Sequence, residues 1–125
     1  MMKSIIYCLL CCLLYSCGGA GNDTAPTEKK PNAAAGEQLF KANCYQCHRP
    51  GAEAMGPNLA GVRDRWPDKN ELYAFVRNPQ EVIGRNKYAR DLQQKYNGTL
   101  MLPYPQLTHD DIDAILEYCD QAGNK

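Results

Sequence analysis

The segment Cys44-Tyr45-Gln46-Cys47-His48 decides how the rest of this 125-residue chain is interpreted. Two cysteines three positions apart lie on the same side of one helical turn. A histidine follows the second cysteine directly. The segment therefore presents two thiols and one imidazole from a single short stretch of backbone.

The pattern C-x-x-C-H is the attachment signal for c-type haem. Each thiol can add to one of the two vinyl groups along a haem edge, while the histidine is directed at the iron. A structural zinc site needs four ligands, and only Cys119 and His109 remain for it. A thioredoxin-like pair should follow a strand, and a structural disulfide would leave His48 without a role. The sequence therefore predicts one covalent haem c on Cys44 and Cys47.

The composition agrees with a core that contains a non-protein group. Leu, Ile, Val and Phe make up only 16 of the 109 residues after position 16, which is below the level of about 20% where disorder is expected. The 14 basic and 14 acidic residues leave no net charge, so the usual companion of disorder is missing. A porphyrin would supply the missing apolar core. The same balance argues against nucleic-acid binding, because there is no positive field to attract phosphates.

The first sixteen residues have the layout of a secretory signal. Lys3 precedes an apolar run from Ile5 to Leu14, which is too short to span a bilayer. The run ends at Leu14-Tyr15-Ser16-Cys17, which resembles the lipobox of bacterial lipoproteins. We therefore expect a signal peptide over 1–16 and a lipid anchor on Cys17; the alternative is an ordinary signal peptide with an incidental cysteine.

Residues 17–32 consist, after the lipidated cysteine, of Gly, Pro, Asn, Thr and charged residues without apolar periodicity. Such a composition predicts a flexible tether. Residues 33–125 then form one domain, because the length allows only one sizeable core. These features predict an exported lipoprotein, facing the periplasm or the outer side of the cytoplasmic membrane.

About four helices and no convincing strand are expected in this domain, which makes it all-α. Asp68 and Glu71 form a capping pattern, Asn97-Gly98 is a helix-ending signal, and Thr108 is followed by acidic residues that suit a helix start. The expected helices are Ala33–Asn43, Asp68–Arg77, Asn86–Tyr96 and a last one from Thr108.

At this point the chain resembles a class I c-type cytochrome of the small bacterial monohaem kind, over roughly residues 34–119. Gly36 and Phe40 match the first helix of that family, which meets the last helix; Ile115 and Tyr118 match the partners there. The resemblance therefore implies the cytochrome c fold.

Two loops carry the rest of the resemblance. Gly56-Pro57-Asn58-Leu59 matches the loop whose proline carbonyl accepts the ring N–H of the haem histidine. Met101-Leu102-Pro103-Tyr104-Pro105 matches the loop of the ligand methionine, although Leu102 and Tyr104 depart from the commonest residues.

His48 is the expected ligand on one face of the iron, and three residues compete for the other. Met55 lies in the segment expected to brace His48 from its own side. His109 stands at the start of a helix that opens with acids, where a solvated histidine is ordinary. Met101 lies in an irregular loop that is free to reach the far face, so it is the expected sixth ligand. An open sixth position is the remaining alternative.

Two aromatic residues are weaker candidates for contacts around the haem. Trp66, with Arg65 beside it, is placed to hydrogen-bond a haem propionate, although a packed tryptophan is the more ordinary arrangement. Tyr88 is a candidate donor to the methionine sulfur, although an aromatic residue on an amphipathic stripe usually belongs to the core.

A haem with histidine and methionine ligands has no vacant position for a substrate, which favours outer-sphere electron transfer over catalysis. The thioether favours Fe(II) and suits a carrier that takes electrons from a quinol-oxidising complex and passes them to a terminal oxidase or reductase. The sequence thus predicts a membrane-tethered electron shuttle that is not itself an enzyme. The alternatives are a haem sensor or peroxidase with an open sixth position, and a fixed subunit of a larger oxidoreductase.

Overall fold

The computed structural model describes residues 31–124. The signal segment, Cys17 and the tether up to residue 30 lie outside the described residues. Within 31–124 there are helices and an isolated antiparallel bridge between Arg49 and Ala52, but no strand. The helices are α1 (Ala33–Asn43), α2 (Val62–Arg65), α3 (Lys69–Arg77), α4 (Pro79–Arg85), α5 (Lys87–Lys95) and α6 (His109–Gly123). The all-α expectation is confirmed, and none of the described helices is long and apolar enough to cross a membrane.

Each of the four expected helices is present, and a side-chain cap explains where each of them begins. The capping residues each stand one residue before their helix and accept a hydrogen bond from a backbone N–H in its first turn; they are Asn32, Asp68, Asn86 and Thr108. In α6 the cap is a reciprocal capping box with Asp111. In α3 the cap is one-sided, because Glu71 pairs with Arg85 instead.

Two short helices, α2 and α4, were not expected. The helix α2 is a single turn, too short to show a period of apolar residues. The helix α4 begins at Pro79, two residues after Arg77, the expected end of the preceding helix; a proline at that place indicated only that the preceding helix must stop. Proline is also well suited to the first position of a helix, because its missing N–H has no partner there anyway.

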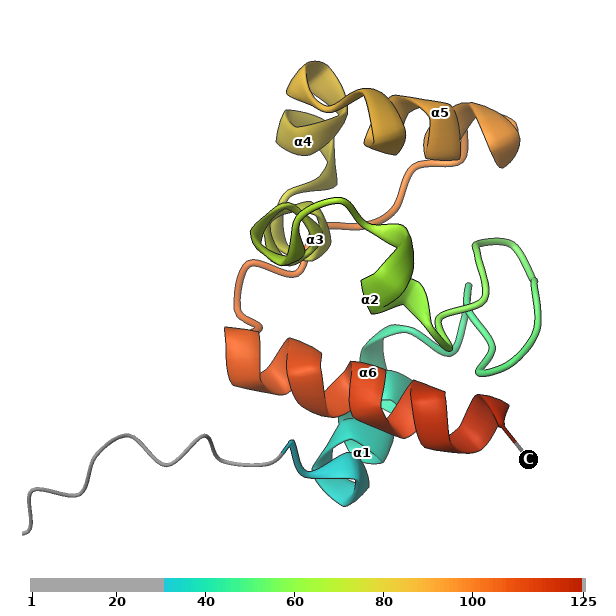
Figure 1. The fold of residues 1–125 in the computed structure, drawn as a ribbon, viewed down its shortest axis with the longest axis vertical. Coiled ribbons are helices and arrows are strands. Elements are labelled where there is room, and N and C mark those ends of the chain that lie inside the picture. The colour runs from blue at the N-terminus through green and yellow to red at the C-terminus, as the bar shows by residue number, and fades with distance from the viewer. Residues whose placement is uncertain (1–30, 125) are drawn as a thin grey trace, which may run out of the picture.

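The first and last helices pack against each other at one end of the domain, as Figure 1 shows. A Cβ on Gly36 would lie 1.8 Å from the carbonyl oxygen of Ala114, so only glycine permits this close approach. The fully buried ring of Phe40 lies 5.5 Å from the ring of Tyr118. These are the helix contacts that the family resemblance implied.

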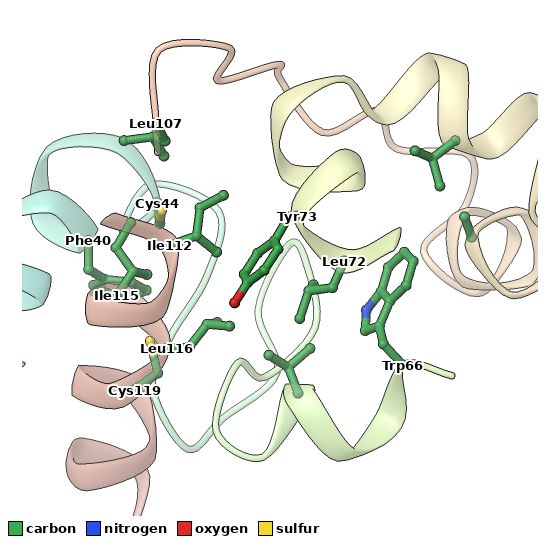
Figure 2. Close-up of a cluster of buried hydrophobic side chains, with 13 residues drawn as sticks. Phe40, Cys44, Trp66, Leu72, Tyr73, Leu107, Ile112, Ile115, Leu116 and Cys119 are labelled. Atoms are coloured by element: carbon green, nitrogen blue, oxygen red, sulfur yellow. The ribbon is translucent and has the colours of Figure 1, made fainter. Parts of the chain in front are cut away.

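The helices α3, α4 and α5 follow one another in contact, with α4 and α5 at the end of the domain away from α1 (Figure 1). A cluster of buried side chains joins these parts, and Figure 2 shows Cys44 within it, close to Ile112 of α6. Tyr73, Leu72 and Trp66 lie on the other side of the same view. The haem-attachment motif therefore lies at the edge of the core.

Candidate functional site

The motif cysteines and His48 lie on a turn that continues directly from α1. Cys44 is the C-terminal cap of α1, and its N–H donates to the carbonyl of Phe40. The N–H groups of Cys47 and His48 both donate to the carbonyl of Cys44, at 3.1 and 2.9 Å. Cys44 is buried, Cys47 is half-buried, and both thiols are free. The two sulfurs and the imidazole are thus presented by one rigid turn.

The ring of His48 is held by the loop that follows the motif. Its Nδ1 lies 2.9 Å from the carbonyl oxygen of Pro57, which is the contact that the resemblance implied. Gly56 lies against the ring, since a Cβ there would be 2.6 Å from the His48 Cε1. Burial lowers the pKa of His48, and the Pro57 carbonyl opposes that shift. A ring that donates from Nδ1 leaves Nε2 available as a metal ligand.

A cavity of about 1280 Å³, including its open mouth, brings the candidate residues together. Cys44, Cys47, His48 and Met101 all line it. Its apolar wall includes Leu59, Val62, Trp66, Leu72, Phe75, Val76, Ile83, Leu92, Ile112, Ile115 and Leu116. Four side chains from two distant parts of the sequence therefore line one apolar space.

The irregular segment that carries Met101 is fastened by Tyr104. The N–H of Tyr104 donates to the carbonyl of Val76 at 3.1 Å, and its hydroxyl donates to the carbonyl of Asn43 at 2.5 Å. Burial raises the pKa of the Tyr104 hydroxyl. From the sequence, Tyr104 stood out only as a departure from the family's usual residue. The hydroxyl of this tyrosine could have indicated the contact, because a buried tyrosine hydroxyl usually has a hydrogen-bond partner.

The other two candidates for the sixth ligand lie in different surroundings. Met55 lines the cavity but is 59% exposed, and it belongs to the same loop as Gly56 and Pro57. His109 does not line the cavity: its ring stacks on that of Tyr73, with centroids 4.3 Å apart and planes 20° apart. The structure thus brings both methionines to the cavity and places the histidine elsewhere.

Trp66 and Tyr88 pack against each other. Trp66 is buried and lines the cavity, and its ring lies 5.1 Å from that of Phe75 and 5.1 Å from that of Tyr88. Tyr88 lines a neighbouring pocket together with Arg65, instead of the cavity that Met101 lines. The contact that the structure gives Tyr88 is therefore packing on Trp66, and it does not bring Tyr88 together with Met101.

The third cysteine of the described region, Cys119, is fully buried on α6 and free. Burial raises its pKa to about 12, so its thiol stays protonated and unreactive at neutral pH. No group of three or more His, Cys, Asp or Glu side chains within residues 31–124 could hold a metal ion. The zinc alternative therefore has no support in this part of the chain.

The residues around the cavity fit a haem c. The donor set consists of two thiols, one imidazole and one thioether, and the wall is apolar. The hydroxyl of Tyr96, which also lines the cavity, is buried and makes no hydrogen bond of good geometry among the described residues, although Glu53 and Lys95 lie near enough to affect its pKa. A buried polar atom without a partner is rare in a finished protein interior, and the propionates or bound waters of a haem would supply one.

The family model described as Cytochrome c matches residues 33–122. Cytochrome c-550 of Bacillus subtilis (strain 168) is 40% identical over 47 residues, which are 37% of this chain and 39% of that protein. Cytochrome c oxidase subunit 2 of Alkalihalophilus pseudofirmus is 29% identical over 96 residues, which are 74% of this chain and 26% of that protein. The chain thus spans well under half the length of these two relatives.

A solved structure agrees with the sequence comparisons. The cytochrome c from Rhodothermus marinus is 33% identical, with a TM-score of 0.60, over 74% of this chain and 77% of that one. The likeness therefore extends to the fold of most of the described region.

Proposed function

The chain belongs to the cytochrome c family, and from this premise we propose that it is a membrane-tethered electron carrier whose haem iron is bound by His48 and Met101. The family implies a covalently bound haem c, and Cys44 and Cys47 occupy the C-x-x-C-H positions. When bound, the haem supplies a one-electron Fe(III)/Fe(II) couple. The chain's own residues hold it, orient the ligands and exclude water.

One observation carries this proposal: the imidazole of His48 and the thioether of Met101 line the same apolar cavity as the two motif thiols. The Pro57 carbonyl supports His48 as a ligand, because a metal-bound histidine usually donates its other ring N–H. The contacts of Tyr104 support Met101, because they hold its segment against α1 and α3. Met55 is a weaker candidate, because it shares the loop that braces His48.

With both axial positions filled, we propose single-electron shuttling between respiratory complexes as the physiological role. The donor would be a quinol-oxidising complex, and the acceptor a terminal oxidase or reductase. The similarity to an oxidase subunit 2 favours an oxidase as acceptor. The expected lipid anchor on Cys17 would keep the carrier at the membrane surface, exported to the periplasm or the outer side of the cytoplasmic membrane.

A fixed subunit of a larger oxidoreductase is the second candidate, and the rim of the cavity favours it. Met55, Leu100 and Leu102 line the cavity and are 59%, 56% and 66% exposed. Exposed apolar residues gathered at one site are typical of protein contact surfaces. Solubilised membranes distinguish the two: a subunit copurifies with its complex through high-salt washes, whereas a shuttle separates from it.

The test of the proposed function uses the full-length protein purified from membranes. Acidified organic solvent should leave the haem on the chain, since the thioether bonds are covalent. A redox titration should follow a one-electron curve, and the reduced protein should resist carbon monoxide because both axial positions are filled. Ready binding of carbon monoxide would contradict the carrier and favour the sensor or peroxidase alternative.

A further inference from the structure

The loop of residues 51–61 is closed at its base by the last turn of α6. A Cβ on Gly123 would lie 2.5 Å from the Cβ of Ala60 and 2.9 Å from the backbone nitrogen of Gly51. The two ends of the loop therefore both meet the helix at Gly123. They are also joined to each other, because Asn58 Oδ1 accepts from the N–H groups of Gly51 and Ala60, at 2.9 and 2.8 Å.

The same turn of α6 holds the end of the loop through Asp120. Its Oδ1 accepts from the N–H of Gly61 at 2.6 Å, and its Oδ2 accepts from the guanidinium of Arg63 at 2.6 Å. Arg63 also donates to the carbonyl of Asp113 at 2.9 Å, so its guanidinium is anchored at two points of α6. Figure 1 shows the C-terminal end of α6 beside this loop.

Between its anchored ends, the loop makes the contacts that orient His48. The Pro57 carbonyl accepts from the ring, and the N–H of Gly56 donates to the carbonyl of Cys47 at 2.9 Å. Residues 51–61 contain no helix or strand, so no regular hydrogen-bond pattern fixes the place of Pro57. Its position depends on the bond from Gly56 to Cys47 and on how the ends of the loop are held.

We propose that the last turn of α6, through Asp120 and Gly123, positions His48 by holding the loop whose Pro57 carbonyl accepts the ring proton. The inference rests on the proposed function, because it takes His48 as the haem ligand. A firm hydrogen bond from the ring makes the histidine a stronger donor to iron, which favours Fe(III). We call the contacts of Asp120 and Gly123 with the loop the clamp. Loosening the clamp should weaken the hydrogen bond from the His48 ring to Pro57 and therefore raise the reduction potential.

The first experiment inserts a methyl group at the base of the loop. The Gly123→Ala variant of the full haem protein is compared with Gly84→Ala, because a Cβ at Gly84 has nothing within 4 Å. NMR of the reduced protein follows the ring N–H of His48. We expect its exchange with solvent to be about tenfold faster in Gly123→Ala, the factor that corresponds to roughly 1.4 kcal/mol. The exchange of the backbone amides of α1 should not change, and the exchange of the His48 ring N–H should not become faster in Gly84→Ala.

The second experiment removes the clamp without adding bulk. Asp120→Ala should displace the His48 ring signal and raise the potential. Asp120→Asn should restore most of the signal, because its amide oxygen can still accept from Gly61. Glu37→Ala is the charge-matched control: it breaks a surface pair with Lys41 at 2.8 Å, far from the loop.

An unchanged ring signal and potential in Asp120→Ala would overturn the proposal, and so would an exchange rate that rises equally for the α1 amides. If Gly123→Ala does not fold, the comparison of Asp120→Ala with Asp120→Asn tests the proposal by itself. A failure of the proposed function looks different, because the parent protein itself would then lack the ring signal of an iron-bound histidine.

Discussion

The hydroxyl of Tyr104 donates a 2.5 Å hydrogen bond to the carbonyl of Asn43, the residue directly before Cys44. The bond joins two points 61 residues apart in the chain. It ties the segment that carries Met101 to the helix end that presents the first motif cysteine. The two halves of the proposed haem site are therefore linked through protein as well as through the haem.

Tyr104→Phe should lower the free energy of unfolding by about 1 kcal/mol, because it leaves the Asn43 carbonyl without its partner. It should also weaken the iron–sulfur charge-transfer absorption of the oxidised protein, because the Met101 segment is less firmly held. Denaturant unfolding and absorption spectra measure the two effects. Tyr45→Phe is the control, since Tyr45 is 50% exposed and its hydroxyl makes no hydrogen bond among the described residues. Equal losses in both variants would show that the bond has no special role.

Met101→Ala should remove the charge-transfer absorption, lower the reduction potential and let the reduced iron bind carbon monoxide. The reason is the loss of the thioether that we propose as the sixth ligand. Met55→Ala is the informative control, because Met55 lines the same cavity. His109→Ala tests the residue that stacks on Tyr73. If Met55→Ala alone opens the iron to carbon monoxide, the ligand assignment passes to Met55.

Gly36→Ala should destabilise the domain by about 3 kcal/mol or prevent its folding, because α1 must move away from α6 to admit the methyl group. The added Cβ would lie 1.8 Å from the backbone oxygen of Ala114. Because that oxygen belongs to the backbone of a helix, no flexible side chain can move aside to relieve the clash. Gly84→Ala should instead be neutral or stabilising by up to about 1 kcal/mol. Chemical denaturation of both haem proteins measures the difference, and a tolerated Gly36→Ala would contradict the packing of α1 on α6.

The capping box of α6 should make the free energy of unfolding depend on pH in the acidic range. Hydrogen bonds from the hydroxyl and backbone N–H of Thr108 lower the pKa of Asp111. Its folded pKa thus lies below the unfolded value of about 3.9, so its stabilisation is complete above that pH and is lost as the pH falls through the folded pKa. Thr108→Ala should flatten this part of the curve of stability against pH between about pH 2 and 5. A curve unchanged in shape would exclude the contribution.

Cys17→Ala should release the protein from membranes that have been washed free of peripheral proteins, because it removes the expected site of lipidation. Fractionation with an antibody against the domain measures this. A variant that partitions as the parent does would show that another feature holds the protein at the membrane.

The sequence predicted those parts of the site that depend on local chemistry. Cys44, Cys47 and His48 are neighbours in the chain, and their spacing alone carries the chemistry. The starts of two helices were recognised from Asp68 and from Thr108 with its acidic neighbours, signals that act within one turn. The helix α4 was missed because Pro79 both ends one helix and begins the next.

The long-range contacts were out of reach of such reasoning. The hydrogen bond from Gly61 to Asp120 joins residues 59 positions apart, and nothing local to either residue indicates it. The same holds for the base of the loop at Gly123, where a close approach of backbones excludes any side chain. Such contacts follow from the packing of whole helices.

The packing of the last helix over the first also sets an order of events in the making of the protein. Cys44 lies in the core beside Ile112, which belongs to α6 (Figure 2). A ribosome adds roughly 5–20 residues per second, so the part of α6 that covers Cys44 is made on the order of several seconds after it. Throughout that interval the first thiol has no helix above it. The fold thus leaves the thiol of Cys44 uncovered by α6 until the chain is almost complete.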